Sequence, residues 1–364
     1  MDKENNLTRV AEFILQGFTD NPSTEVALFL LFLAIYVITV SGSLGLMVLI
    51  RMDSRLHKPM YFFLGHLAFT DLCYTSAIAP KMLANFLAEK KAISYAGCVT
   101  QLWAFAAFLS TECFLLAVMA FDRYMAICNP LLYSAVMSQK LCCCLVVGSY
   151  AAGVANSALQ TVCVFRLSFC TRSIIKHFFC DIPKLLMLSC SETFLSESLS
   201  VFATGMVAMI SLSAIIVSYF GIVLAILRIQ SLKGRHKAFS TCASHLTSVT
   251  LLYGTGSVMY LHPDLKSGLD KDMVISVFYT LVIPMLNPLI YSLRNKEVKE
   301  AIRTVVRENG TRCAHSSAPL PHPAAVLWAA APDAEGCWLH NWGSASIPGH
   351  RVASAFFAGP GCAK

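Results

Sequence analysis

Long runs of hydrophobic residues alternate with short polar segments along most of the chain. Seven of these runs are each long enough for the roughly 20 helical residues that cross about 30 Å of hydrocarbon. They cover residues 26–50, 59–87, 99–127, 141–164, 199–227, 238–261 and 273–293. The second, third and sixth runs contain Asp71, Glu112 and His245. The pattern predicts an all-α membrane protein built as a seven-transmembrane helix bundle.

Composition and charge support a bilayer environment. Of the 364 residues, 56% are hydrophobic and only 13% are charged, whereas a soluble domain has about 25% charged residues. Much of the net charge of +7 comes from basic segments at 51–58, 228–237 and 294–307. If the helices alternate in direction, these segments share one side, and their Lys and Arg place that side in the cytoplasm. We therefore expect a multi-pass plasma-membrane protein with no nucleic-acid partner.

The predicted organisation has four parts. Residues 1–25 form an extracellular N-terminus without the apolar stretch of a signal peptide, and Asn6 begins an Asn-Leu-Thr glycosylation acceptor. Residues 26–293 form the seven-transmembrane domain. Residues 294–308 carry apolar positions at near-helical spacing among basic residues, which predicts a short amphipathic cytoplasmic helix in contact with membrane lipid. Residues 309–364 are rich in Ala, Pro, Ser and Gly and predict an atypical, disordered cytoplasmic tail.

Two carboxylates fall inside predicted membrane helices. Asp71 lies twelve residues from the start of its run, and Glu112 lies ten residues before Asp122. At 1.5 Å per residue, the two carboxylates are about 18 Å and 15 Å from the same face of the bundle. Two anions at similar depth need either a protonated partner or a hard cation among oxygen ligands. Equally open is the simpler interpretation, in which each carboxylate is separately hydrogen-bonded to Ser, Thr or Asn of a neighbouring helix.

An adjacent acid and base end the third apolar run, in the stretch "MAFDRYMAICNP". Asp122 and Arg123 can be read as an interfacial ion pair from which the arginine extends to water. They can also be read as a latch, in which an arginine held by a neighbouring acid is released when the cytoplasmic face changes. The seventh run ends in "PMLNPLIYSLRN", where Pro284 and Pro288 remove backbone donors and predict a kink.

These motifs together resemble those of olfactory receptors, which belong to the rhodopsin-like (class A) superfamily of G-protein-coupled receptors. The resemblance rests on "LHKPMYFFLGHLAFTDLCY" (56–74), "MAFDRYMAICNPLLY" (119–133), "SY" (218–219), "KAFSTCASHL" (237–246) and "PMLNPLIYSLRN" (284–295), and it covers roughly residues 7–308. It implies an odorant receptor that binds a small, mostly apolar odorant within the helix bundle and activates a Gs-type G protein to raise cAMP. It also implies no cofactor other than an allosteric sodium ion at Asp71 and Glu112.

The resemblance assigns further roles to individual residues. Spacing alone leaves three pairings open for the four outer cysteines, and the resemblance pairs Cys98 with Cys180 and Cys170 with Cys190. It places the G-protein switch at Asp122, Arg123, Tyr124, Tyr219, Asn287, Pro288 and Tyr291. It lines the ligand pocket with Phe105, Ala106, Leu109, Ser110, Thr204, Val207, Tyr253, Gly256, Ser257, Tyr260 and Thr280.

Other functions follow from the same residues. A small-solute transporter or channel would use Asp71 and Glu112 as an ion path, but it would be expected to show paired broken helices in two related halves. A receptor for a non-odorant ligand is a second alternative. A non-signalling product is a third, because Ser43 stands where the family usually has Asn and the tail is atypical. The sequence contains no nucleophile–base set, phosphate loop or metal-ligand spacing, so we do not expect an enzyme.

Overall fold

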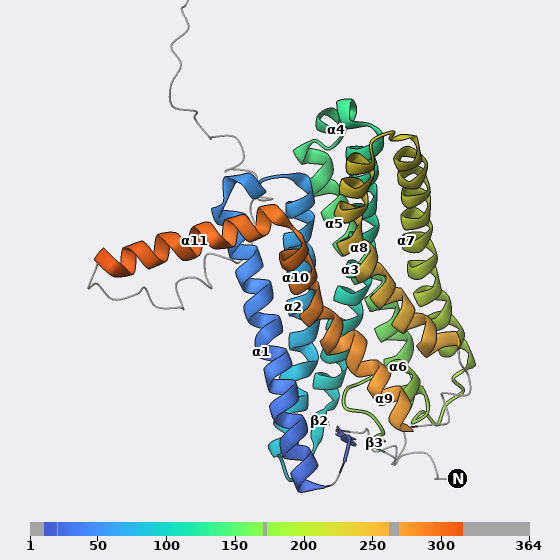
Figure 1. Cartoon of the computed structure of the whole chain (residues 1–364). Coiled ribbons are helices and arrows are strands. Elements are labelled where there is room, and N and C mark those ends of the chain that lie inside the picture. The colour runs from blue at the N-terminus through green and yellow to red at the C-terminus, as the bar shows by residue number, and fades with distance from the viewer. Residues whose placement is uncertain (1–10, 20, 170–172, 262–268, 316–364) are drawn as a thin grey trace, which may run out of the picture.

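The computed structural model describes residues 11–19, 21–169, 173–261 and 269–315. In this part of the chain, seven membrane-length helical segments form one bundle (Figure 1). They are α1 (Pro22–Met52), α2 (Pro59–Leu87), α3 (Tyr95–Cys128), α5 (Gln139–Phe165), α7 (Phe194–Arg228), α8 (Leu232–Leu261) and the composite of α9 (Leu269–Val277), a π-helical turn η3 (Phe278–Val282) and α10 (Ile283–Arg294). Among the described residues, six helical stretches are long and apolar enough to cross a membrane. The seventh, α8, begins with basic residues, is rich in Ser and Thr, and completes the predicted bundle.

Local sequence signals set where these helices begin. Helix α1 starts at Pro22, before the apolar run predicted from residue 26, because the Asn21 side chain accepts a hydrogen bond from the Ser23 amide at 3.0 Å and proline favours the first helical turn. Helix α3 is capped in the same way by Ser94, whose hydroxyl accepts from the Gly97 amide at 3.1 Å. The first span therefore includes residues assigned from the sequence to the N-terminus.

The seventh span is interrupted next to its first proline. The Ile283 amide donates to the Phe278 carbonyl, five residues back, which is the π-helical pattern. Pro284 follows directly and has no amide hydrogen to donate. Two hydroxyl groups of α2 donate hydrogen bonds to backbone carbonyls of this π-helical turn. Tyr74 donates to the Tyr279 carbonyl and Thr75 to the Thr280 carbonyl, each at 3.4 Å. The irregular turn thus lies just before the predicted kink and is tied to α2.

Helix α3 lies at the centre of the bundle and packs against α2, α5, α7 and α8. Close contact with α5 depends on Gly153, since a Cβ atom built there would lie 2.2 Å from the Thr111 hydroxyl. A second close approach joins α1 to α10, where a Cβ atom at Gly42 would lie 3.3 Å from Pro288. Small residues of this kind let membrane helices approach each other closely.

One end of the bundle carries a small sheet, and we call it the sheet end (Figure 1). Strand β1 (Glu12–Leu15) pairs antiparallel with β2 (Ala92–Ser94) and parallel with β3 (Ile174–Ile175). Phe13 and Leu15 of β1 are buried, so this part of the N-terminal segment packs onto the bundle. The all-α prediction did not include this sheet. The short helix α6 (Ile182–Leu186) lies at the same end.

The opposite end carries the short helix α4 (Pro130–Val136), and we call it the α4 end. A 3₁₀ turn, η1 (Ser54–Leu56), joins α1 to α2 there. Helix α11 (Lys296–His315) runs away from the bundle at this end (Figure 1) and is anchored to α2 by hydrogen bonds from Tyr61 to Glu297 (2.9 Å) and from Lys58 to Glu297 (2.7 Å). Its length exceeds the predicted 294–308, so residues 309–315 are helical rather than part of a disordered tail. Residues 316–364 lie outside the described part of the chain.

Candidate functional site

A disulfide fixes the segment before α6 to the sheet end of α3. Cys98 and Cys180 are bonded, with Cα atoms 5.6 Å apart, and the Cys180 amide donates to the Gln101 side chain at 2.9 Å. Cys190 is also disulfide-bonded. Its predicted partner, Cys170, lies outside the described residues, as does the predicted glycosylation site Asn6, so both assignments stay predictions.

Two polar contacts join the same segment to the seventh span. His177 is fully buried, with its Nε2 atom 3.2 Å from the Ser276 hydroxyl. Burial, with a smaller contribution from Lys184, lowers the pKa of His177 to about 3, so the ring is neutral. Lys184 forms an ion pair with Asp272 at 2.8 Å. The segment from residue 177 to 184 is therefore held from both α3 and α9.

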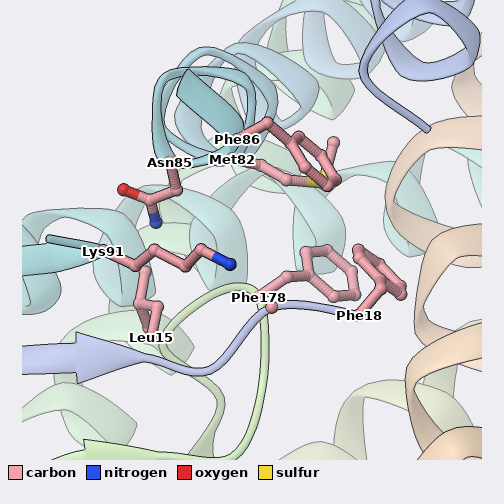
Figure 2. A pocket seen from close by; sticks show the side chains of 8 residues that line it. Leu15, Phe18, Met82, Asn85, Phe86, Lys91 and Phe178 are labelled. Carbon is pink, nitrogen blue, oxygen red and sulfur yellow. The ribbon is translucent and has the colours of Figure 1, made fainter. Parts of the chain in front are cut away.

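A narrow pocket opens at the sheet end (Figure 2), and its lining contains none of the residues predicted to bind ligand. Its lining residues are Leu15, Gly17, Phe18, Met82, Asn85, Phe86, Lys91 and Phe178. The rings of Phe18 and Phe178 stack with centroids 5.0 Å apart, and the Lys91 ammonium pairs with Glu25 at 2.5 Å. Figure 2 shows the N-terminal segment passing over the end of α2 here, so the pocket belongs to the contact between that segment and the bundle.

The predicted ligand residues are distributed over α3, α7, α8 and the π-helical turn. Phe105, Ala106, Ser110 and Thr280 are buried, whereas Ser257 is exposed. Leu109, Thr204, Val207, Tyr253 and Gly256 are half-buried, and the side chain of Tyr260 lies outside the described set. Phe105 makes an edge contact with Phe179, with ring centroids 5.3 Å apart. The disulfide-bonded segment thus covers part of the predicted pocket.

Two amide side chains of α5, which were not predicted from the sequence, reach this region. Asn156 donates to the Ser110 hydroxyl at 2.8 Å, and Gln160 donates to the Thr204 hydroxyl at 3.1 Å. Gln160 also donates to the Asn156 carbonyl oxygen at 3.3 Å. The available signal was the presence of two amide side chains four residues apart, on one helix face, inside an apolar run.

Asp71, Glu112 and Asn287 meet in the middle of the bundle, all essentially inaccessible to solvent. The Asn287 amide donates to both oxygens of Asp71 and to Oε1 of Glu112, each at 3.1 Å. Among the residues that the structure describes, Glu112 Oε2, Asn287 Oδ1 and Ser43 Oγ are buried and have no hydrogen-bond partner. Two carboxylates with unsatisfied oxygens nearby form a donor set suited to a hard cation. In the simpler interpretation from the sequence, each carboxylate had its own hydrogen-bond partners. In the structure, the two carboxylates share the amide of Asn287.

Five of the seven predicted switch residues lie in the halves of their helices nearer the α4 end: Asp122, Arg123, Tyr124, Tyr219 and Tyr291. Asn287 lies in the polar centre, and Pro288 lies near Gly42 of α1. Asp122 and Arg123 are buried, with exposures of 2% and 5%. Tyr133 of α4 donates a hydrogen bond to Asp122 at 2.8 Å. Tyr133 therefore contacts the carboxylate that is expected to hold Arg123. Tyr124 packs against α7 at Gly221, where an added Cβ would lie 2.5 Å from its ring.

His245 links three helices near the same end. Its Nε2 atom lies 2.9 Å from the Leu116 carbonyl of α3 and its Nδ1 atom 2.9 Å from the Tyr219 hydroxyl of α7. A carbonyl can only accept, so Nε2 carries the proton and Nδ1 accepts from Tyr219 when the ring is neutral. Tyr291 of α10 is also buried, with 4% exposure. The contacts of His245 hold α8 against α3 and α7.

Seven membrane-length helices, a disulfide at the sheet end, a polar centre and a buried Asp-Arg pair define a seven-helix membrane receptor rather than an enzyme. The family model described as olfactory receptor matches residues 32–309. Olfactory receptor 5G9 of Mus musculus is 56% identical over 305 residues, which cover 84% of this chain and 97% of that protein. Olfactory receptor 9I1 of Homo sapiens is 52% identical over 304 residues, or 84% of this chain and 97% of the relative. The chain belongs to the olfactory receptor family.

Proposed function

We propose that this receptor binds a small, mostly apolar odorant between the sheet end and the polar centre, and that it activates a Gs-type G protein and raises cAMP. In this proposal the sheet end is extracellular, the α4 end faces the cytoplasm, and the membrane is the plasma membrane. The basic segments of residues 51–58, 228–237 and 294–307 support this orientation, because all three lie at the α4 end.

The bridge through His245 is the observation that carries the signalling part of the proposal. It closes α8 against α3 and α7 beside the buried Arg123. Helix α8 cannot move outward without breaking hydrogen bonds to Leu116 and Tyr219, and in this proposal the active arrangement is the one in which these bonds are broken. An odorant shifts the balance between the closed and the active arrangement only through its different affinity for the two arrangements.

We also propose that a sodium ion binds at the polar centre as an allosteric ligand. The Asp71 and Glu112 carboxylates would hold it, together with the unpartnered oxygen atoms of Asn287 and Ser43. A bound sodium ion would offset one of the two adjacent negative charges, which otherwise share one amide. The ion would stabilise the arrangement in which α2, α3 and α10 are close together.

Replacing Arg123 tests the proposed signalling. The Arg123→Ala variant is expected to reach the cell surface and to lose odorant-driven cAMP production, because the proposal gives Arg123 the task of receiving the G protein. Arg51→Ala, at the exposed end of α1, is the matched control and should retain the response. Full odorant-driven cAMP production by Arg123→Ala at equal surface level would contradict the proposal. Odorant-driven ion flux without G-protein activation would favour the channel alternative.

A further inference from the structure

The hydroxyl groups of the predicted ligand pocket differ in whether their protons are already engaged. Thr280 donates to the Ser276 carbonyl at 2.6 Å, and Ser257 donates to the Tyr253 carbonyl at 2.7 Å. Tyr253 donates to the Ser211 hydroxyl at 2.6 Å. These three hydroxyls have therefore already given their protons to the protein, and their capacity to donate to a ligand is reduced.

Ser110 and Thr204 differ from these three residues because their hydroxyls accept hydrogen bonds from the protein. Each accepts a hydrogen bond from an amide of α5, Ser110 from Asn156 and Thr204 from Gln160. In the part of the chain that the structure describes, neither hydroxyl donates to another residue. The two side chains come from α3 and α7, and the amides that hold them come from the helix between, so all three helices meet at this point.

The direction of these hydrogen bonds determines whether the two hydroxyls can act as donors to a ligand. Gln160 donates to the Asn156 oxygen, so the Asn156 oxygen is engaged and its NH₂ group is directed to Ser110. The second amide proton of Gln160 is then directed to Thr204. A hydroxyl that accepts from a fixed amide retains one proton to donate. Both hydroxyls thus keep a proton that can be donated to a ligand.

We propose that Asn156 and Gln160 determine ligand specificity by presenting Ser110 and Thr204 as hydrogen-bond donors. The favoured ligands are neutral molecules that carry an acceptor oxygen and no donor, such as ketones, aldehydes and esters. An alcohol can also accept from the two hydroxyls, but its own proton would remain buried without a partner, which costs free energy. This inference rests on the proposed odorant function and names its ligand class.

Matched ligands of one carbon skeleton provide the test. Methyl ketones, the corresponding secondary alcohols and the corresponding alkanes, from four to ten carbons, are compared on cells that express the full chain. Two readouts are used: cAMP production, and the ligand-induced shift of the receptor's thermal unfolding midpoint, which needs no G protein. The wild type is expected to prefer each ketone over its alcohol by about three- to tenfold, the range of one hydrogen bond, and to respond least to the alkane.

Four variants distinguish the contribution of the two amides to ligand preference from that of the two hydroxyls. Asn156→Leu and Gln160→Met keep side-chain volume but free the hydroxyls to rotate and accept, so the ketone preference should fall to within about twofold. Ser110→Ala and Thr204→Val remove the donors, so ketone potency should fall toward that of the alkane. Ser149→Ala is the control on the same helix, because its buried hydroxyl donates to the Leu145 carbonyl of α5 itself, and it should keep the wild-type preference.

The outcomes distinguish the two proposals. A wild type that responds to the panel but prefers alcohols, or does not discriminate, overturns the donor assignment and leaves the odorant function standing. A preference for alcohols is the result expected if the oxygen and nitrogen atoms of both amides, Asn156 and Gln160, were exchanged, because the two hydroxyls would then donate to the amides and accept from the ligand. A wild type at the cell surface that shows neither cAMP nor a thermal shift with any ligand overturns the odorant function, and the inference with it. Unchanged ketone preference in all four variants also overturns the inference.

Discussion

The Tyr133 hydroxyl donates a 2.8 Å hydrogen bond to the Asp122 carboxylate. This contact joins the short helix α4 to the end of α3, where an acid and a base interrupt an apolar run. Asp122 is 2% exposed, so its carboxylate depends on partners within the protein. Tyr133 is therefore part of the proposed switch, and the position of α4 is coupled to the state of Asp122.

Removing the Tyr133 hydroxyl should loosen the resting state. In Tyr133→Phe the buried carboxylate loses a charge-assisted hydrogen bond, which stabilises by about 1.5–3 kcal/mol. We expect basal cAMP to rise at least severalfold at equal surface level, in the same direction as in Asp122→Asn. Ser134→Ala, an exposed neighbour on α4, should leave basal cAMP unchanged. Basal cAMP in Tyr133→Phe equal to that of the wild type would show that the hydrogen bond does not restrain the switch.

Sodium should stabilise the receptor through the polar centre. At ten times the Kd, one bound ion adds about 1.4 kcal/mol to the free energy of unfolding. We expect the thermal unfolding midpoint of the wild type to rise when sodium replaces choline at constant ionic strength. Glu112→Gln and Asp71→Asn should abolish the rise, because each removes one of the two carboxylates. An equal rise in the wild type and both variants would mean that sodium acts elsewhere.

The sequence predicted the bundle because hydropathy over about 20 residues is a strong, local signal. The small sheet, by contrast, could not be predicted from the sequence. Strand β1 has four residues, and its partners are β2 and β3, far along the chain. A strand this short shows almost no alternation, and its pairing depends on how the helices bring distant loops together.

How much of the candidate site could be predicted from the sequence differed from one part of the site to another. Asp71 and Glu112 could be placed at one depth from helix rise alone, but the role of Asn287 as their common donor required the fold. Asn156 and Gln160 were missed because an amide in a membrane helix has many packing explanations, and only the approach of α3 and α7 shows what these two bind.

The close approach of α3 and α5 predicts a stability effect at Gly153. An added Cβ would lie 2.2 Å from the Thr111 hydroxyl and 2.6 Å from the Ala107 carbonyl oxygen. The backbone oxygen cannot rotate away, so Gly153→Ala should separate the helices and destabilise the receptor by about 1–3 kcal/mol. Gly148→Ala is the control on the same helix, because nothing lies within 4 Å of its added Cβ. Similar unfolding midpoints and surface levels for the two variants would contradict the close packing.

The Cys98–Cys180 disulfide should be required for a stable receptor. It links residues 82 positions apart, and losing such a bond typically costs about 2–5 kcal/mol. Cys98→Ser and Cys180→Ser are both expected to reduce surface level sharply, and the double variant should be no worse than either. Cys144→Ser, an exposed free cysteine on α5, should be tolerated. Normal surface level and ligand response in both single variants would mean that the bond is dispensable.

The pH dependence of stability should reveal the environment of Asp181, which precedes α6 outside the membrane-spanning helices. Burial raises the pKa of Asp181 to about 6, although Lys184 and the Ile182 amide act in the opposite direction. The ordinary value of 3.8 applies when the chain is unfolded. The folded state therefore favours the protonated carboxyl, and this contribution to stability is present at low pH and is lost as pH rises from about 4 through 6.

Asp181→Asn should remove that loss, because asparagine is neutral at every pH and can still accept the 3.0 Å hydrogen bond from the Ile182 amide. We expect its thermal unfolding midpoint to match the wild type near pH 4 and to exceed it by a few degrees above pH 6. Titration of His177 is common to both proteins and cancels in the difference. Asp53→Asn is the control of opposite sign, because hydrogen bonding to Arg55 lowers the pKa of Asp53, so this variant should be less stable than the wild type at neutral pH. A difference between Asp181→Asn and the wild type that does not change between pH 4 and 7 would show that Asp181 is charged in the folded receptor.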